Sequence, residues 1–334
     1  MTKVRGGVLS TAGIAQTALI PAFNRSSNAV VTAIASSSGS EKAKAVAHEH
    51  NIDQAYDSYE KLLVDPDIDA VYIPLPNHLH KQWVIEAANH GKHILCEKPA
   101  GLNAAEVIEM KSVCEQNKVL FMEAYMYQFH PQHDRVKEII AAGEIGEVLY
   151  VQGGFTFFMP EEDRSQNIRM SHEKGGGSIY DIGGYPIHAV RQIIGMEPTS
   201  VTTEAIVDPT YEVDTDVVAH LTFPSGIRAT IDSSFNLAMR HEYRVFGTEG
   251  SINVPRAFRP DIHGGEGLVI VENSRNYRIE TINGDIYRLQ VEHFSEAVLN
   301  RHSECKQTFE DTIKNMRVID ACYESIRTGG QVNL

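Results

Sequence analysis

Hydrophobic residues in the first 123 positions fall into two alternating kinds of segment. Short apolar runs predict buried strands, and longer segments with apolar residues at helical spacing predict amphipathic helices. The predicted strands span residues 4–9, 29–35, 70–73, 93–96 and 119–123, and the predicted helices span residues 14–23, 41–50, 80–90 and 104–116. Strands that alternate with helices pair in parallel through right-handed crossovers. The pattern therefore predicts a doubly wound, parallel Rossmann sheet.

Beyond about residue 145 the pattern changes to long segments of alternating apolar and polar residues. These segments predict strands at residues 147–158, 201–207, 217–223, 227–236 and 243–247, with helices at residues 178–194 and 309–328. We expect a fold of class α/β plus α+β, in which a large, mostly antiparallel open sheet forms the second half. The predicted division is a Rossmann domain over residues 1–123 and an α+β domain over residues 124–334.

Length and charge narrow the classes of function. A chain of 334 residues exceeds the size at which one core stops growing, so two domains are expected. The formal net charge of -14 argues against an extended basic surface for nucleic acid. No apolar run is long enough to span a membrane, and the N-terminus lacks a signal-peptide core. We expect neither nucleic acid nor a membrane as a partner.

The four cysteines form no CxxC pair and no short-range pairing with histidine of the kind that structural zinc needs. We interpret them as reduced thiols of a cytoplasmic protein. A metal-dependent hydrolase built on His48, His50, His78 and His80 is disfavoured, since His48 and His50 diverge on a helix and no third ligand is suitably spaced. We therefore expect no metal.

The turn after the first predicted strand reads Ser10-Thr11-Ala12-Gly13-Ile14-Ala15. It is a degenerate form of the G-x-G-x-x-G/A nucleotide turn, in which small residues let a pyrophosphate approach a helix N-terminus. An ordinary strand-to-helix turn is the alternative interpretation. We take Ser10, Thr11, Ala12, Gly13 and Ile14 as candidate cofactor contacts.

The second predicted strand ends in Ser36 and Ser37, where an NAD-binding domain usually places an acid on the ribose hydroxyls. These hydroxyls can donate to a 2′-phosphate without repelling it, and Lys42 could add positive charge. The alternative is a polar loop that caps the next helix. The sequence therefore favours NADP over NAD.

The segment Glu97-Lys98-Pro99 directly follows a strand that reads as buried. At the carboxyl end of a parallel strand, such charges face the crevice where open α/β sheets bind ligands. Lys98 could hydrogen-bond a substrate hydroxyl and transfer its proton. A solvated Glu–Lys pair in a loop is the alternative.

A second polar group lies on the helix predicted at residues 178–194. Asp181, Tyr185 and His188 are spaced i, i+4 and i+7, which places them on one helical face. A polar stripe of this kind can face substrate, but Asp181 could instead cap the helix and His188 could be a core histidine. Arg169, ahead of the glycine run, is a candidate substrate contact or a surface residue.

Five motifs, in this order along the chain, resemble those of the Gfo/Idh/MocA oxidoreductase family. They are Ser10 to Ala15, Pro76-Asn77-His78-Leu79-His80, Glu97-Lys98-Pro99, Met122-Glu123-Ala124-Tyr125-Met126-Tyr127, and Gly175-Gly176-Gly177-Ser178-Ile179-Tyr180-Asp181-Ile182-Gly183-Gly184-Tyr185. Within the family, the chain is most similar to the branch that contains glucose-fructose oxidoreductase, D-xylose dehydrogenase and dimeric dihydrodiol dehydrogenase. The resemblance covers essentially the whole chain.

The resemblance implies specific roles for several residues. Lys98 would be the catalytic lysine, preceding Pro99 in a cis peptide, and Asp181 and Tyr185 would complete the active site. The cofactor pocket would be lined further by four residues before and at the start of the helix predicted over residues 80–90, and by the acid and the lysine after the next strand. These residues are Leu75, Pro76, Asn77, His80, Glu97 and Lys98.

Together these features predict an NAD(P)-dependent oxidoreductase that transfers a hydride between nicotinamide and a hydroxyl or carbonyl carbon of a sugar, inositol or related diol. Two alternatives stay open: a non-catalytic NADP-binding regulatory protein, and a sugar–sugar oxidoreductase that keeps its cofactor tightly bound. An antiparallel sheet with an uncovered face is also an association surface, so we expect a homodimer or homotetramer through the C-terminal sheet.

Overall fold

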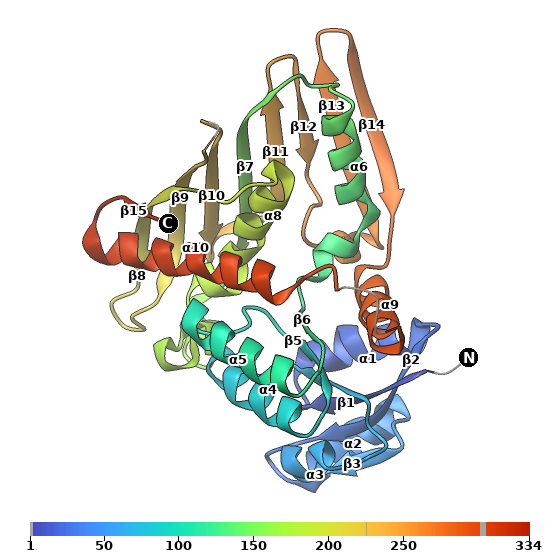
Figure 1. The fold of residues 1–334 in the computed structure, drawn as a ribbon. Helices are drawn as coiled ribbons and strands as arrows, with labels where there is room; N and C mark the ends of the chain where they lie inside the picture. The colour runs from blue at the N-terminus through green and yellow to red at the C-terminus, as the bar shows by residue number, and fades with distance from the viewer. Residues whose placement is uncertain (1–2, 225, 301–304) are drawn as a thin grey trace. The chain divides into compact units, whose positions relative to one another are not determined.

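A computed structural model describes residues 3–224, 226–300 and 305–334 (Figure 1). Within these residues the chain forms two compact units, one from Met1–Met126 and Tyr287–Ile313 and the other from Tyr127–Ile286 and Lys314–Leu334. The predicted division at residues 123 and 124 assigns Tyr287–Ile313 to the second domain, whereas in the structure this segment packs in the first unit. A turn predicted at Pro224, Ser225 and Gly226 includes residue 225, which lies outside the described residues.

The first unit is built on a six-stranded parallel sheet in the order β3-β2-β1-β4-β5-β6. Its strands are β1 (Val4–Leu9), β2 (Ala29–Ala35), β3 (Gln54–Tyr56), β4 (Ala70–Ile73), β5 (His93–Cys96) and β6 (Phe121–Glu123). This order is that of the Rossmann fold, so the predicted fold class is confirmed for this unit. Strands β4, β5 and β6 are almost wholly buried, as expected for parallel strands covered on both faces.

The four helical segments predicted for residues 1–123 are present close to their predicted bounds, together with two helices that were not predicted. They are α1 (Ile20–Arg25), α2 (Ser40–His50), α3 (Tyr59–Leu63), α4 (His80–Asn89), α5 (Ala104–Gln116) and α9 (Ile286–Leu299), with a π-helix η1 (Ala15–Leu19) and a 3₁₀ turn η2 (Asn77–Leu79). Asn103 caps α5 by accepting a hydrogen bond from the amide of Glu106 at 3.0 Å. Among these elements, β3, α3 and α9 were not predicted from the sequence; β3 and α3 have only three and five residues, which are too few to show a period.

Tyr287–Ile313 joins the first unit through specific contacts. In α9 the carbonyl of Glu292 accepts a hydrogen bond from Asn28 Nδ2 at 2.8 Å. The ring of Phe309 stacks on that of Phe121 at a centroid distance of 4.3 Å. The unit therefore draws on two stretches of chain that are far apart in sequence.

The second unit is built on a nine-stranded sheet in the order β14-β13-β12-β11-β7-β10-β9-β8-β15. Its strands are β7 (Val148–Phe158), β8 (Ser200–Val207), β9 (Asp214–Thr222), β10 (Arg228–Ser234), β11 (Asn236–Gly247), β12 (Gly250–Val254), β13 (Glu266–Asn273), β14 (Asn276–Asn283) and β15 (Val332–Asn333). All neighbours pair antiparallel except β10 and β7, which pair parallel. The expected large, mostly antiparallel sheet is confirmed.

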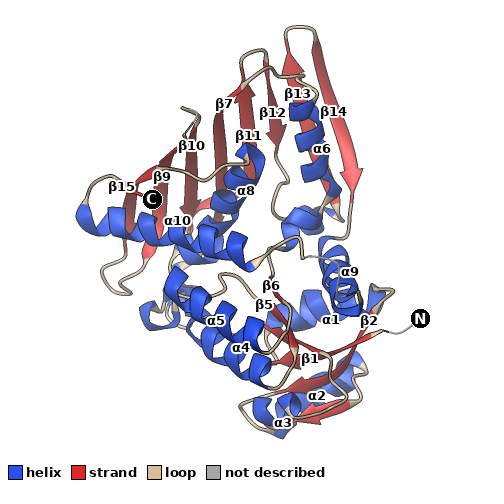
Figure 2. Cartoon of the chain, viewed as in Figure 1, coloured by secondary structure: helices blue, strands red, loops and turns tan. Residues whose placement is uncertain are grey.

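Helices α6 (Pro131–Ala141), α8 (Gly184–Ile194) and the later part of α10 (Phe309–Thr328) cover one face of the sheet, as Figures 1 and 2 show. The short elements of this part of the chain are α7 (Glu161–Arg164), η3 (Met126–Phe129), η4 (Ile168–Met170), η5 (His172–Lys174), η6 (Ile179–Gly183) and η7 (Pro260–His263). Residues of β9 alternate accordingly between buried Val217, Ala219 and Leu221 and more exposed neighbours. None of the described helices combines the length and apolarity needed to cross a membrane.

Candidate active site

The turn after β1 has the backbone that a nucleotide-binding turn needs. Ser10 adopts a φ of 144°, a value that glycine reaches far more easily than other residues. The Ala12 carbonyl accepts hydrogen bonds from the amides of Ala15 and Gln16 at 3.1 and 3.3 Å, so a helix starts at this turn. An added Cβ on Gly13 would meet no atom within 4 Å, and Ile14 is 38% exposed. The turn therefore leaves room for a pyrophosphate at a helix N-terminus.

The end of β2 shows how a 2′-phosphate could be accepted. Ser36 is buried, and its Oγ accepts a hydrogen bond from the amide of Ser38 at 3.2 Å, whereas Ser37 and Lys42 are exposed. No acid occupies residues 35–40, so the strand end itself places no carboxylate beside a phosphate. The local geometry fits NADP.

The segment after β5 is held from three sides. Glu97 accepts a hydrogen bond from the Tyr72 hydroxyl at 2.6 Å, and the Ala100 amide donates to the buried carboxylate of Glu123 at 2.8 Å. Burial beside Glu97 raises the pKa of Tyr72 well above its usual value. The Lys98–Pro99 peptide bond is cis, as expected. Lys98 is partly buried between these held residues.

The third hold on this segment is the side chain of His80, which has no exposed surface. Its Nδ1 lies 2.8 Å from the Pro99 carbonyl and its Nε2 lies 2.7 Å from the Leu75 carbonyl. Both ring nitrogens are thus occupied by the main chain. Instead of offering a group to the cofactor, His80 ties the loop after β4 to the loop after β5, while Pro76 and Asn77 stay partly exposed.

These loops lie along one edge of the first sheet. Since β2, β1, β4 and β5 are neighbours and parallel, their carboxyl ends meet at the same edge. Residues 10–14, 36–37, 75–77 and 97–98 follow those ends. This edge is where open α/β sheets bind nucleotides.

In the second unit Asp181 forms a short ion pair. Its carboxylate lies 2.6 Å from Nε of Arg169, and the Asp181 charge raises the pKa of Arg169. Asp181 is 14% exposed, but Arg169 is 42% exposed and lies 6.0 Å from the centroid of the Phe157 ring. A guanidinium held through Nε has its outer face available for further hydrogen bonds.

Tyr185 lies in an aromatic cluster next to this pair. Its ring centroid is 5.4 Å from that of Phe155 and 5.7 Å from that of Phe258, and only 5% of the residue is exposed. His188 is completely buried, with Nδ1 2.6 Å from the hydroxyl of Tyr127. The structure thus gives His188 a place in the core.

The helix predicted over residues 178–194 is two elements in the structure. A π-helix, η6, precedes α8, and Pro186 lies in the first turn of α8, where its missing amide is tolerated. Asp181 is in η6 and Tyr185 is in α8. Asp181, Tyr185 and His188 therefore do not lie along one face of a single α-helix, because Asp181 lies in the wider turn of the π-helix. Such π-helical turns are frequent at functional sites.

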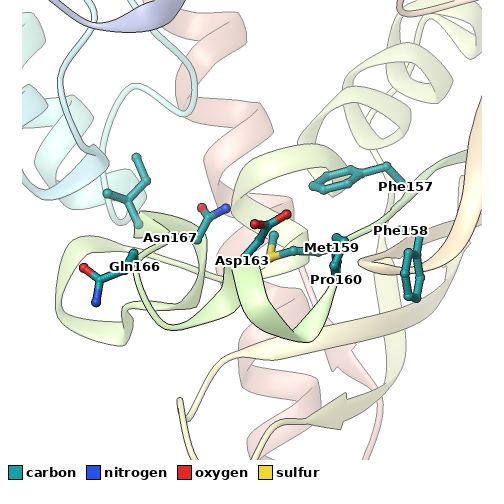
Figure 3. A pocket seen from close by; sticks show the side chains of 8 residues that line it. Phe157, Phe158, Met159, Pro160, Asp163, Gln166 and Asn167 are labelled. Atoms are coloured by element: carbon teal, nitrogen blue, oxygen red, sulfur yellow. The ribbon is translucent and has the colours of Figure 1, made fainter.

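A shallow hollow of about 490 Å³ opens beside the segment that leads to Arg169. Figure 3 shows Phe157 and Phe158 leaving the end of β7 in different directions, as successive strand residues do. Asp163 and Asn167 add polar groups to the lining. Aromatic rings together with such groups suit a polyhydroxy compound.

The sequence analysis assigned no role to Tyr72, Glu123, Ser178 or Asp214, all of which make contacts at these sites. Glu123 carried a signal, because a charged residue that ends a buried strand has to find a partner. Tyr72 and Asp214 lie within predicted or observed strands and carried none. Among the described residues, no three His, Cys, Asp or Glu side chains gather as they would around a metal.

Comparison with known proteins adds family membership. A model described as an oxidoreductase family with an NAD-binding Rossmann fold matches residues 5–125, and a model of the GFO/IDH/MocA C-terminal domain matches residues 133–253. The chain is 39% identical to D-xylose 1-dehydrogenase (NADP(+)) 2 of Haloferax volcanii over 328 residues, covering 98% of this chain and 99% of that protein.

Two solved structures have the same fold along nearly their whole length. Aldose-aldose oxidoreductase from Caulobacter crescentus, complexed with glycerol, gives a TM-score of 0.91 at 26% identity and covers 99% of this chain and 100% of that chain. A 3-ketoreductase from Actinomadura kijaniata, in complex with NADP and TDP-benzene, gives 0.90 at 28% identity and covers 97% and 98% of the two chains.

Proposed function

The chain belongs to the Gfo/Idh/MocA family of NAD(P)-dependent oxidoreductases, and from this premise we propose that it transfers a hydride between NADP and a hydroxyl or carbonyl carbon of a sugar or related polyhydroxy compound. The observation that carries the proposal is the threefold support of the Glu97–Lys98–Pro99 segment at the nucleotide edge of the first sheet. Inositols and diols belong to the same substrate class. The similar D-xylose dehydrogenase and aldose-aldose oxidoreductase favour a sugar.

For the cofactor, we assign the pyrophosphate to the turn at residues 10–14 and the 2′-phosphate to Ser37 and Lys42. Ser36 shapes the loop that presents them, since its hydroxyl already accepts the amide of Ser38. Pro76, Asn77 and Glu97 flank the nicotinamide end, with Leu75 and His80 holding that loop from within. The nicotinamide supplies hydride exchange when it is bound.

Lys98 is the proposed acid–base group. During oxidation it takes the proton of the reacting hydroxyl, and during reduction it returns a proton to the carbonyl oxygen. Its neighbours on both sides are fixed by Tyr72 and His80, so the amine starts from a defined main-chain position. Pre-positioning of this kind lowers the entropic part of the barrier.

Asp181 and Tyr185 are the proposed catalytic partners in the second unit, where they bind substrate hydroxyl groups. Arg169 adds a weaker contact through the outer face of its guanidinium. The Asp181–Arg169 pair and the aromatic cluster around Tyr185 support these assignments. His188 contributes through the core, because its Nδ1 is occupied by Tyr127.

The test is a screen of sugars, inositols and diols with NAD and NADP in parallel, followed by Lys98→Met. We expect the variant to lower turnover by about 10² to 10⁴ while it retains cofactor affinity. Lys61→Met, at an exposed lysine paired with Asp57, is the matched control and keeps full turnover. Normal turnover in Lys98→Met would refute the role of the amine.

A sugar–sugar oxidoreductase with tightly bound cofactor is a second candidate, favoured by the likeness to aldose-aldose oxidoreductase. It predicts that the purified protein already shows the absorbance of bound nicotinamide and exchanges hydride between two sugars without added cofactor. A regulatory protein on the same fold would bind NADP but turn over no substrate in the screen.

The exposed face of the second sheet supports the proposed homodimer or homotetramer. Phe158, Val218 and Ile206 share the face opposite the helices and are 63%, 41% and 65% exposed. Exposed apolar side chains on an uncovered sheet face favour association. The expected cytoplasmic location stays a prediction, and all four cysteines are buried free thiols.

A further inference from the structure

The carboxylate of Asp214 is buried beneath the turn that carries Asp181. Asp214 is 3% exposed, and its Oδ2 accepts hydrogen bonds from the Ser178 hydroxyl and the Ile179 amide, each at 2.8 Å. Its Oδ1 accepts a third from the Tyr323 hydroxyl at 2.9 Å. One carboxylate thus joins β9, the start of η6 and helix α10, all within the second unit.

The glycine run before η6 is shaped around this carboxylate. Gly177 has a φ of +112°, and an added Cβ there would collide with Oδ1 of Asp214. The amide of Gly177 donates to the Arg169 carbonyl at 2.8 Å, and its carbonyl accepts from the Asp181 amide at 3.1 Å. A side chain at this position would displace either the carboxylate or the main chain that links Arg169 to Asp181.

A β-bulge places Asp214 on the inner face of the sheet. In the pairing of β8 with β9, Ile206 lies opposite Asp216 but Val207 lies opposite Asp214, so β9 contains one extra residue at this point. A bulge of this kind redirects a side chain to the other face of the sheet. Asp214 is therefore buried although Asp216, two residues on, lies on the outer face.

We infer that Asp214 is a positioning residue for catalysis: its carboxylate fixes the start of η6 and thereby the places of Asp181 and Tyr185. Three donors from two other elements converge on it, so this one carboxylate links the start of η6 and helix α10 to β9. The Ser178 hydroxyl also contacts the Ser233 hydroxyl of β10 at 2.9 Å, so the turn is held against the sheet from a second side. The inference rests on the proposed function, because it concerns residues assigned there.

The test compares Asp214→Ala, Asp214→Asn and a control. The asparagine keeps an acceptor for Ser178 and Ile179, and its amide group can donate to the Tyr323 oxygen. Ser325→Ala is the control: Ser325 is buried in the same helix as Tyr323, but it accepts from the Thr203 amide at 2.8 Å and holds β8, not the turn. Each variant is measured for turnover, KM, NADPH affinity, melting temperature and hydrogen exchange of the amides in residues 177–185.

We expect Asp214→Ala to speed exchange in residues 177–185 and to lower kcat by about 100-fold, the scale of a 1 Å misplacement, with NADPH affinity unchanged. Asp214→Asn keeps slow exchange and most of the turnover. Ser325→Ala lowers the melting temperature but changes neither readout. If Asp214→Ala does not fold, Ser178→Ala takes its place and should speed exchange of the same amides.

Two results would overturn the inference. One is protected amides and normal kcat in Asp214→Ala, or in Ser178→Ala where that variant replaces it; the other is equal damage in Asp214→Asn and Asp214→Ala. Failure of the proposed function looks different, because the unmodified protein would then turn over no substrate in the screen. The exchange measurement would still report whether Asp214 anchors the turn.

Discussion

Nε of Arg169 donates to the carboxylate of Asp181 at 2.6 Å, and the main chains of the same two residues are linked through Gly177. The pair therefore acts as a unit in which Asp181 orients the guanidinium. A planar guanidinium offers a fixed fork of donors, which an ammonium lacks.

Arg169→Met should lower kcat/KM for the substrate about tenfold to a hundredfold, the worth of one charge-assisted hydrogen bond, with cofactor affinity unchanged. Arg169→Lys should recover only part of the loss. Steady-state kinetics of these variants measure the effect. Arg228→Met, at an exposed arginine of β10, is the control. Unchanged kcat/KM in Arg169→Met would assign the pair to folding alone.

His80 lies between two main-chain carbonyls, and because burial lowers its pKa to about 4, the neutral ring donates a hydrogen bond to only one of them. Substitution can show which of the two contacts supports catalysis. Asparagine places its amide nitrogen near the position of Nδ1, which faces Pro99, whereas glutamine reaches the position of Nε2, which faces Leu75. Because Pro99 follows Lys98, we expect His80→Asn to keep higher turnover than His80→Gln. Turnover of both variants is measured at a temperature well below the melting temperature of each. A reversed order would contradict the prediction.

Asp214 also makes a prediction about stability and pH. Burial raises the pKa of its carboxyl group to about 6, from an ordinary 3.8. Protonated Asp214 therefore stabilises the folded protein. This contribution to the unfolding free energy is fully present below 3.8, the pKa of the carboxyl group in the unfolded chain, and is lost as the pH rises through about 6. The loss amounts to about 3 kcal/mol, since each pKa unit is worth about 1.4 kcal/mol.

Asp214→Asn removes this titration. The unfolding free energy of Asp214→Asn relative to the unmodified protein should therefore rise by about 3 kcal/mol between about pH 4 and pH 7. Urea unfolding of both proteins across that range measures the difference, in which the shared titrations cancel. A difference that is constant with pH would show that the carboxyl group titrates normally.

A charged residue introduced on the uncovered face of the second sheet should disrupt the proposed oligomer. Val218 lies on this face in β9, the third strand from one edge of the sheet, and Val218→Glu should dissociate the proposed oligomer. Val64→Glu, at an exposed position of the first unit, should leave it intact. Sedimentation at micromolar concentration measures both, and an unmodified protein that sediments as a monomer would exclude the oligomer.

The sequence by itself determined the fold class and the nucleotide edge. Strands β1, β2, β4 and β5 have their predicted bounds, because short, mostly apolar runs between helices have few other structures available. The motifs at residues 10–14 and 97–99 follow strands predicted to be parallel, and the carboxyl ends of parallel strands lie at one edge of the sheet. These features depend on local pattern, which a single sequence displays.

Only the tertiary structure decided which polar side chains act on the candidate site. Alternation along β9 places Asp214 in register with outward-facing Asp216, and a bulge formed with β8 reverses this. The sequence predicts His80 as a cofactor contact, but in the structure its two ring nitrogens face carbonyl groups from two separate loops. Such outcomes depend on strand register and on contacts between distant segments, whose energies come from neighbours that no local pattern reveals.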